Sequence, residues 1–343
     1  MTAGPAEPLD ATGGAGPLPA PVVAPAGTPE LPLLRVATAD LVLTFAPTRG
    51  GRLLSLVAGG RELLWHDPLL LDSDLAPVRP VASWPASDGD MSTWANVGGS
   101  KTWPAPQGWS GPEEWAGPPD PVLDSGAWTA AWTTTPGLAT VTLTSADDPR
   151  SGLRVERRFT VPASGTAFTQ TATFTNVSAV PRTWSIWEVC QVDTAGGAGR
   201  PVEEAAVVVA HAERPVELDL GSWEGRVAST RHGDDVLLPV GSGVAKRGYP
   251  EASGSVAYRA DGLALELATV PGPGPGGTWP DGGSKVEVWL QRPTAEPITS
   301  LGDLHPAAHL VELEVLGPLT TLAPGGSTSL DVSWSVSVAD RSR

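Results

Sequence analysis

Two glutamates near the carboxyl end of the chain, Glu312 and Glu314, have the spacing of a paired acid–base site. They lie in the segment HLVELEVLG, whose β-branched and apolar residues predict a strand. Because side chains alternate across a strand, both carboxylates share a face with Leu310 and Leu316. Two carboxylates on one face repel each other, which raises the pKa of one of them, as proton transfer requires. A pair of hydrated, solvent-facing glutamates fits the same spacing.

A second group of polar and aromatic residues lies in the predicted strand RTWSIWEVCQVD, residues 182–193. Alternation places Trp187, Gln191 and Asp193 on one face, and Glu188 and Cys190 on the other. An indole beside amide and carboxylate groups is typical of a row that binds sugar. A core tryptophan beside polar edge residues is the alternative interpretation.

The stretch NVGGSKTWPAPQ, residues 96–107, offers the third group of candidates. Asn96, Lys101 and Trp103 lie in it, and Arg52 is the other cation that we expect at a ligand. Seven of the 14 tryptophans lie between residues 84 and 132. Pro, Gly and Asp crowd residues 84–124, which predicts a long irregular loop. We expect some tryptophans to anchor this loop, and Trp103 and Trp109 to contact the ligand.

The histidines and the single cysteine carry little chemistry by themselves. His305 is a candidate proton donor, and His309 follows it at a spacing that would suit a metal only on a helix. Pro306 favours a loop instead, so we expect no metal site. Cys190 alone forms neither an internal disulfide nor a cysteine cluster. The Gly-rich segments lack the strand–loop–helix context of a phosphate site, and we expect no cofactor.

The elements that must position these residues are short strands. From residue 33 onward, Val-, Thr- and aromatic-rich runs alternate between apolar and polar and end at Gly, Pro, Asp or Asn. The 40 Gly and 36 Pro likewise favour turns over long helices. The pattern predicts one all-β domain of antiparallel sheets over residues 32–338. Residues 201–212 fit a strand or a helix, and residues 270–283 are expected to form a surface loop.

The ends and the charge of the chain limit its surroundings. Residues 1–31 are mostly Ala, Pro and Gly, which predicts a disordered tail, and residues 339–343 form a second tail. No secretory signal is recognisable, so a cytoplasmic protein is expected. The net charge of -16 argues against nucleic acid or an anionic membrane surface as a partner. The partner that we expect is a small-molecule ligand. Oligomeric state does not follow from the sequence.

Three segments together resemble the aldose 1-epimerase, or galactose mutarotase-like, superfamily. They are GGRLLSLVAGGRELLW near the start, LRVERRFTVPASGTAFTQTATFTNVSAVPRTWSIW in the middle, and VELEVLGPLTTLAPGGSTSLDVSWSV at the end. The chain is most similar to a bacterial branch that carries the GGxKxWPAPQ segment. The resemblance implies a β-supersandwich of antiparallel sheets whose concave face binds a sugar. It also implies a carboxylate base, matched by the Glu312–Glu314 strand, and a histidine acid.

The chain departs from the family at that histidine. The corresponding position is at or near Trp187, an indole that cannot transfer a proton, whereas Glu188 or His305 could. The favoured function is therefore an aldose epimerase-like isomerase acting on a sugar or related polyol, with Glu312 or Glu314 as base. A non-catalytic carbohydrate-binding protein, or an enzyme that uses the scaffold for lyase or cyclase chemistry, are the alternatives.

Overall fold

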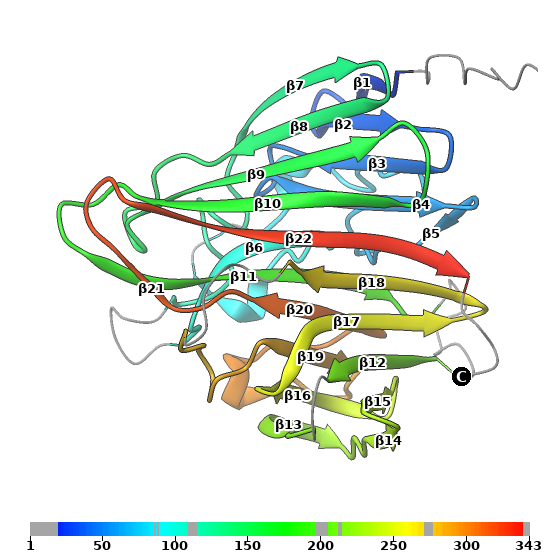
Figure 1. Cartoon of the computed structure of the whole chain (residues 1–343), viewed down its shortest axis with the longest axis vertical. Helices are drawn as coiled ribbons and strands as arrows, with labels where there is room; N and C mark the ends of the chain where they lie inside the picture. The colour runs from blue at the N-terminus through cyan, green and yellow to red at the C-terminus, as the bar shows by residue number, and fades with distance from the viewer. Residues whose placement is uncertain are drawn as a thin grey trace, which may run out of the picture.

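Two stacked antiparallel β-sheets make up the protein (Figure 1). A computed structural model describes residues 20–85, 87, 89–108, 115–195, 205–211, 215–270 and 277–338. Short apolar runs separated by turn residues form the strands, and the all-β prediction is confirmed. Within the described residues, helical structure is limited to the short 3₁₀ segments η1 (Val81–Ser83), η2 (Met91–Thr93) and η3 (Thr299–Leu301). None of them is long enough to span a membrane.

The larger sheet has 12 strands. In spatial order they are β1 (Val22–Gly27), β2 (Pro32–Ala37), β3 (Leu41–Ala46), β4 (Arg52–Ala58), β6 (Ser100–Ala105), β11 (Arg182–Asp193), β20 (Leu310–Leu316), β19 (Val286–Gln291), β16 (Gly243–Tyr249) and β13 (Leu218–Gly225), with β5 (Arg61–Glu62) on β4 and β21 (Thr320–Leu322) on β11.

The smaller sheet has 10 strands. Their order is β14 (Thr230–His232), β15 (Asp235–Pro239), β12 (Ala206–His211), β17 (Ala252–Ala260), β18 (Leu263–Thr269), β22 (Ser327–Val338), β10 (Ala167–Asn176), β9 (Leu153–Pro162), β8 (Leu138–Thr144) and β7 (Thr129–Thr135). Of residues 201–212, which fitted a strand or a helix, residues 206–211 form strand β12.

The core lies between the two sheets. In β9, Val155, Phe159 and Val161 are fully buried while the alternate positions face outward, which is the period-two pattern of a half-covered sheet. Arg157 interrupts this apolar series and pairs with Glu188 of the other sheet at 2.7 Å, with both side chains inaccessible to solvent. Glu188, the alternative acid of the sequence interpretation, is therefore a structural partner inside the sandwich.

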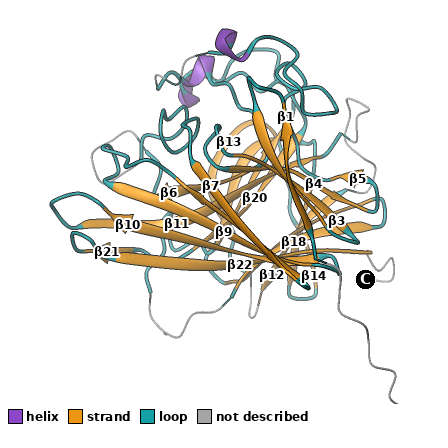
Figure 2. Cartoon of the chain, turned by 90° about the horizontal axis from the view of Figure 1, so that it is seen from above, coloured by secondary structure: helices purple, strands orange, loops and turns teal. Residues whose placement is uncertain are grey.

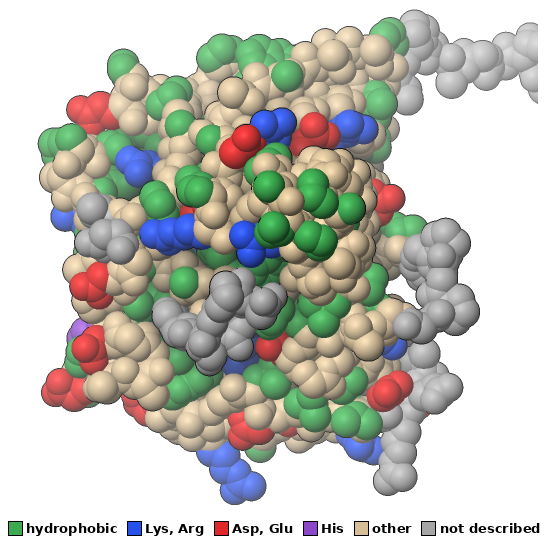
Figure 3. All heavy atoms as spheres, turned by 90° about the vertical axis from the view of Figure 1, so that its left-hand side faces the viewer, with side chains coloured by type: hydrophobic (Ala, Val, Ile, Leu, Met, Phe, Trp, Pro, Cys, Tyr) green, Lys and Arg blue, Asp and Glu red, His purple; other side chains and the backbone are tan. Residues whose placement is uncertain are grey.

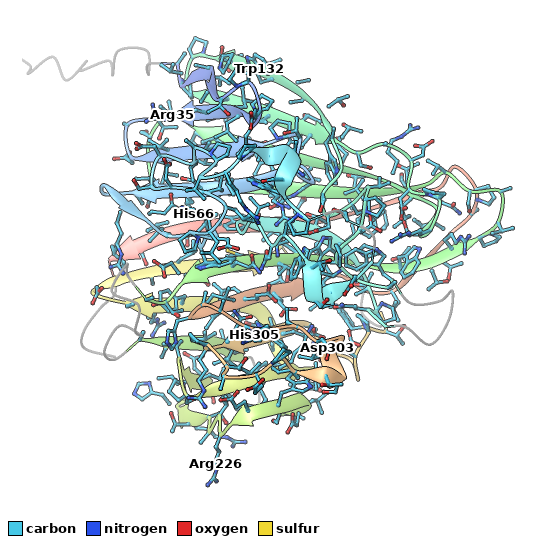
Figure 4. All side chains as sticks on the ribbon, turned by 180° about the vertical axis from the view of Figure 1, so that it is seen from behind. Arg35, His66, Trp132, Arg226, Asp303 and His305 are labelled. Carbon is cyan, nitrogen blue, oxygen red and sulfur yellow. The ribbon has the colours of Figure 1, made fainter. Side chains whose placement is uncertain are left out.

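The other face of the 12-stranded sheet is partly covered by loops. Figure 2 shows the 3₁₀ segments gathered at one side of the sandwich, and Figure 4, seen from behind, shows loops lying over the sheet. Segments η2 and η3 lie close together there. A Cβ placed on Gly302, at the end of η3, would lie 3.2 Å from Cβ of Met91 in η2. The two segments form a roof over the face of β6, β11, β20, β19 and β16.

Two segments differ from the sequence predictions. Residues 22–27, expected to belong to the disordered tail, form β1 and pair along their length with β2. Because β1 is at the edge of the sheet, Pro25 removes no essential ladder hydrogen bond. Residues 84–124, expected to be irregular, contain β6, which pairs with β11 from Ser100 to Ala105. Strand β6 pairs with β4 at Ser100. Pro104 lies beyond that point, so the backbone N–H that it lacks removes no hydrogen bond to β4.

Candidate functional site

A pocket with a volume of about 290 Å³ opens under the η2–η3 roof. Five tryptophans, five other apolar residues and several polar groups line it, the combination typical of a small-molecule site. The lining residues are Met91, Trp94, Asn96, Trp103, Gln107, Pro118, Trp187, Gln191, Leu220, Trp223, Lys246, Asp281, Trp289, Gln291, Leu301, Leu304 and Glu312.

Strand register places four of these residues in one row across the floor. Gln191 of β11 is opposite Glu312 of β20, which is opposite Trp289 of β19, which is opposite Lys246 of β16. Neighbouring strands are about 4.8 Å apart, so the backbones at Glu312 and Lys246 are separated by roughly 10 Å. The residue between them is Trp289, whose indole packs against that of Trp223, while Nζ of Lys246 lies next to Glu287, Glu314 and the ring of Trp187. The row thus brings a carboxylate, an indole and a lysine side chain to the same part of the pocket.

Glu312 reaches the pocket with a partly exposed carboxylate. Its Oε1 accepts a hydrogen bond of 2.6 Å from Nε2 of Gln191 and lies 3.9 Å from Nζ of Lys101. Its side chain is 14% exposed, which leaves the carboxylate accessible to a ligand. The amide of Gln191 thus orients the carboxylate without removing its charge.

Lys246 is held between two buried carboxylates. Its Nζ lies 2.7 Å from Glu287 Oε2 and 3.2 Å from Glu314 Oε2, and 4.3 Å from the ring centroid of Trp187. Burial alone would lower the pKa of Lys246, but the two carboxylates raise it above its ordinary value. Burial raises the pKa of Glu287 and of Glu314 against the opposing charge of Lys246. The indole N–H of Trp187 donates to Glu314 Oε2 at 2.6 Å.

Lys101 is in a different environment under the same floor. Its side chain is 1% exposed, with Nζ 3.3 Å from Oδ1 of Asn96 and over the rings of Trp94 and Trp103. Burial, followed by the charge of Arg52, lowers the pKa of Lys101 to about 7. The ammonium group is therefore easily deprotonated at neutral pH.

The structure brings together about half of the residues that the sequence analysis selected. Asn96, Trp103, Trp187, Gln191 and Glu312 line the pocket. Lys101 and Glu314 are buried next to lining residues. Trp109 lies outside the described residues. Three others, Arg52, Asp193 and His305, are not among the lining residues.

These last three side chains have structural partners. The buried guanidinium of Arg52 binds Asp124 and donates to the carbonyl of Gly98 at 2.8 Å, so it stabilises the turn before β6. Asp193 accepts from the backbone N–H of Ala195. The exposed His305 lies with Nε2 3.1 Å from the carbonyl oxygen of Thr294; Figure 4 shows it beside the labelled Asp303. The prediction that His305 supplies the acid is not supported by this position.

Sequence analysis missed Lys246, Glu287 and Trp289. A signal for two of them existed, because KVEVWLQ (residues 285–291) alternates and so places Glu287 and Trp289 on one face. No comparable signal singled out Lys246, since a lysine in a strand is more commonly solvated. Within the described residues, no group of three His, Cys, Asp or Glu side chains has a geometry that could hold a metal ion.

Solved structures with a similar fold include a galactose mutarotase-like protein from Lactobacillus casei (12% identity, 89% of this chain and 100% of that one, TM-score 0.53). Another such protein, from Clostridium acetobutylicum, is 10% identical over 93% of this chain and 99% of that one, with a TM-score of 0.54. A TPR-domain containing protein from Parabacteroides distasonis has a TM-score of 0.55 at 12% identity, and this chain covers 54% of its length.

No protein-family model matches the sequence, and no curated protein matches it. The similarity is thus one of backbone architecture, and at 10–12% identity it extends to the fold and not to the site residues. The two antiparallel sheets, the similarity of those structures over most of the chain and the sequence motifs all indicate the same fold. This chain has the galactose mutarotase-like β-sandwich fold.

Proposed function

We propose that the pocket binds a cyclic aldose and interconverts its two anomers. The observation that carries the proposal is the Glu312–Trp289–Lys246 row, in which Glu312 and Lys246 are the strand neighbours of Trp289 on either side and all three residues line the pocket. A sugar ring stacks on an indole face through its C–H bonds. A ring seated on Trp289 would hold its anomeric hydroxyl and ring oxygen in the space that Glu312 and Lys246 line. The mutarotase-like fold of the solved neighbours agrees with this assignment.

The reaction needs one proton removed and one supplied. Glu312 takes the proton of the anomeric hydroxyl, the bond from C1 to the ring oxygen breaks, and Lys246 protonates that oxygen. Rotation about the C1–C2 bond of the open-chain aldehyde presents its other face, and the reverse transfers close the ring. Glu314 is adjacent to Lys246, and its raised pKa keeps a proton available to restore the ammonium group.

Anomer exchange measured by NMR tests the proposal. The wild type is expected to accelerate the exchange of at least one common aldose over the uncatalysed rate. Glu312→Gln and Lys246→Met are each expected to lower kcat by about 100-fold or more, the contribution typical of one acid or base. Glu156→Gln is the matched control, because Glu156 lies on the opposite sheet and pairs with the exposed Arg158. Unaltered exchange in both pocket variants would contradict the assignment.

Non-catalytic sugar binding is the second candidate, and one observation favours it. The two carboxylates that hold Lys246 raise its pKa, which opposes release of its proton. Saturable sugar binding by the wild type without acceleration of anomer exchange would establish this alternative.

A further inference from the structure

Acids outnumber bases around the pocket. Four carboxylates and two ammonium groups lie in its lining or directly beneath it: Asp281, Glu287, Glu312 and Glu314, and Lys101 and Lys246. The raised pKa values of Glu287 and Glu314 fit this surplus, because protonation relieves the burial and mutual repulsion of like charges. A positively charged ligand would relieve the same repulsion.

The basic groups near the pocket are already engaged by the protein. Lys246, the one Lys or Arg among the described lining residues, contacts two carboxylates. Lys101 is covered by Trp94 and Trp103. Arg52 is buried against Asp124. An anionic ligand such as a sugar phosphate would therefore meet the carboxylate surplus, and no basic group among the described lining residues is left to pair with it.

The aromatic lining already accommodates ammonium groups. Nζ of Lys246 lies 4.3 Å from the ring centroid of Trp187, and Nζ of Lys101 lies 4.6 Å from that of Trp103. A cation over an indole face within about 6 Å is attracted by the ring quadrupole. On the opposite side of the floor, Trp223 and Trp289 form a further pair with centroids 5.2 Å apart, and both line the pocket.

We propose that the ligand class of this pocket is the amino sugars, in which a pyranose ring carries a protonated amine. The inference rests on the proposed function for the seating of the ring on Trp289, and adds that carboxylates pair with the ammonium group. Glu312 and Asp281, the two carboxylates among the described lining residues, are its candidate partners. A 2-amino group is next to the anomeric carbon and so is placed near Glu312. A 6-amino group is placed at the opposite end of the ring.

Calorimetric titration at low salt and neutral pH tests the inference. The probes are glucosamine and 6-amino-6-deoxyglucose, compared with glucose and glucose 6-phosphate. At least one amino sugar is expected to bind about tenfold more tightly than glucose, with glucose 6-phosphate the weakest, because a ligand charge in a partly buried site interacts strongly. Equal affinity for the amino and neutral sugars, tightest binding of the phosphate, or no binding of any sugar would overturn it.

Two variants locate the charge that selects the amine. Glu312→Gln and Asp281→Asn each remove one carboxylate with little change in size, and at least one of them is expected to abolish the preference for the amino sugar. Asn suits position 281 because the backbone there has a φ of 51°, a region that Asn tolerates. Glu156→Gln again serves as the control for net charge and is expected to keep the preference. An undiminished preference in both pocket variants would contradict the assignment.

Proton release gives a second readout that does not depend on folding of a variant. An ammonium group bound near Glu314 and Glu287 lowers their pKa values, so protons leave on binding. Titrations in two buffers of different ionisation enthalpy are expected to show proton release for the amino sugar and less for glucose. Equal proton release for both sugars would contradict the proposed charge pairing.

Anomer exchange separates this inference from the proposed function. Preferential binding of amino sugars without accelerated exchange would overturn the isomerase and leave the ligand class standing. Accelerated exchange of glucose with no preference for the amine would do the opposite.

Discussion

Lys101 and Lys246 carry the same side chain on the same sheet, yet their neighbours give them opposite acidities. Lys246 has two carboxylates within 3.2 Å, and their charge raises its pKa despite burial. Lys101 has one carboxylate at 3.9 Å and the amide oxygen of Asn96, and burial lowers its pKa to about 7. One lysine thus keeps its proton, while the other loses it near neutral pH.

This difference predicts how stability depends on pH. Between about pH 7 and pH 10 the unfolded chain keeps the Lys101 proton and the folded protein does not, so Lys101 makes stability rise with pH across that window. Lys101→Met removes the cost of burying the charge. The variant is therefore expected to gain more stability over the wild type at pH 6 than at pH 9.5.

Urea unfolding at the two pH values measures this gain. Lys285→Met is the matched control, because Lys285 lies over the ring of Trp279 and is not among the described lining residues of the pocket. An equal change for Lys101→Met at both pH values would show that the amine does not titrate in this window.

Strand β6 illustrates what a single element contributes. It carries Lys101 and Trp103 on the pocket face and Ser100 and Thr102 on the inner face, where they bind the Arg157–Glu188 pair. In the turn that leads into β6, the backbone of Gly98 lies very close to that of Trp65. Gly98 has a φ of 98°, and a Cβ there would lie 2.2 Å from the carbonyl oxygen of Trp65. Glycine is required at that point because another residue would move the start of β6.

Gly98→Ala is expected to destabilise the protein by about 2 kcal/mol or more, through a strained φ and a backbone clash. Ligand binding should weaken as well, because Asn96 and Trp103 flank the displaced turn. Gly59→Ala is the matched control: its φ of 57° is also positive, but a Cβ there has open space. Urea denaturation and calorimetry compare the two variants, and equal losses of stability would argue against a close approach at Gly98.

At the scale of the whole molecule, the two sheets are joined by a buried polar contact as well as by apolar packing. Arg157 extends from β9 to Glu188 on β11 and also donates to the backbone carbonyls of Gly51 and Ser100. Gln170 of β10 donates to the same carboxylate. This contact fixes one lateral position of the sheets, whereas apolar packing alone tolerates sliding. Elsewhere the net charge of -16 is spread out, and Figure 3 shows acidic and basic side chains interspersed on one face.

Removal of one partner from this contact leaves an unpaired buried charge. Arg157→Met is expected to lower the free energy of unfolding by about 3–5 kcal/mol, while the double variant with Glu188→Leu should lose much less than the sum of the single losses. Equilibrium denaturation of all four proteins provides the double-mutant cycle. Additive losses would show that the two charges are not coupled across the sheets.

Local sequence patterns were sufficient to predict the all-β architecture and the residues on one side of the pocket. Alternation in residues 182–193 and 310–316 correctly grouped Trp187 with Gln191, and Glu312 with Glu314, because a strand places every second side chain on one face regardless of its neighbours. The same alternation places Glu188 on the opposite face of the strand from Trp187. Local patterns also predicted most of the strands. They missed β1 and β6, because the Pro and Gly residues in and around these segments are typical of tails and loops.

Which rows of side chains come together in the pocket depends on the tertiary structure. Lys246 is 66 residues before Glu312 in the sequence. The two residues nevertheless lie in one row with Trp289, because β20, β19 and β16 are neighbours in the sheet. The pairing of strands that are distant in sequence depends on the summed packing of the whole sandwich, which no local pattern encodes. The shifted pKa values follow from burial and from such neighbours. For that reason Lys246, the acid that we propose, could not be found from the sequence, in which His305 was the candidate.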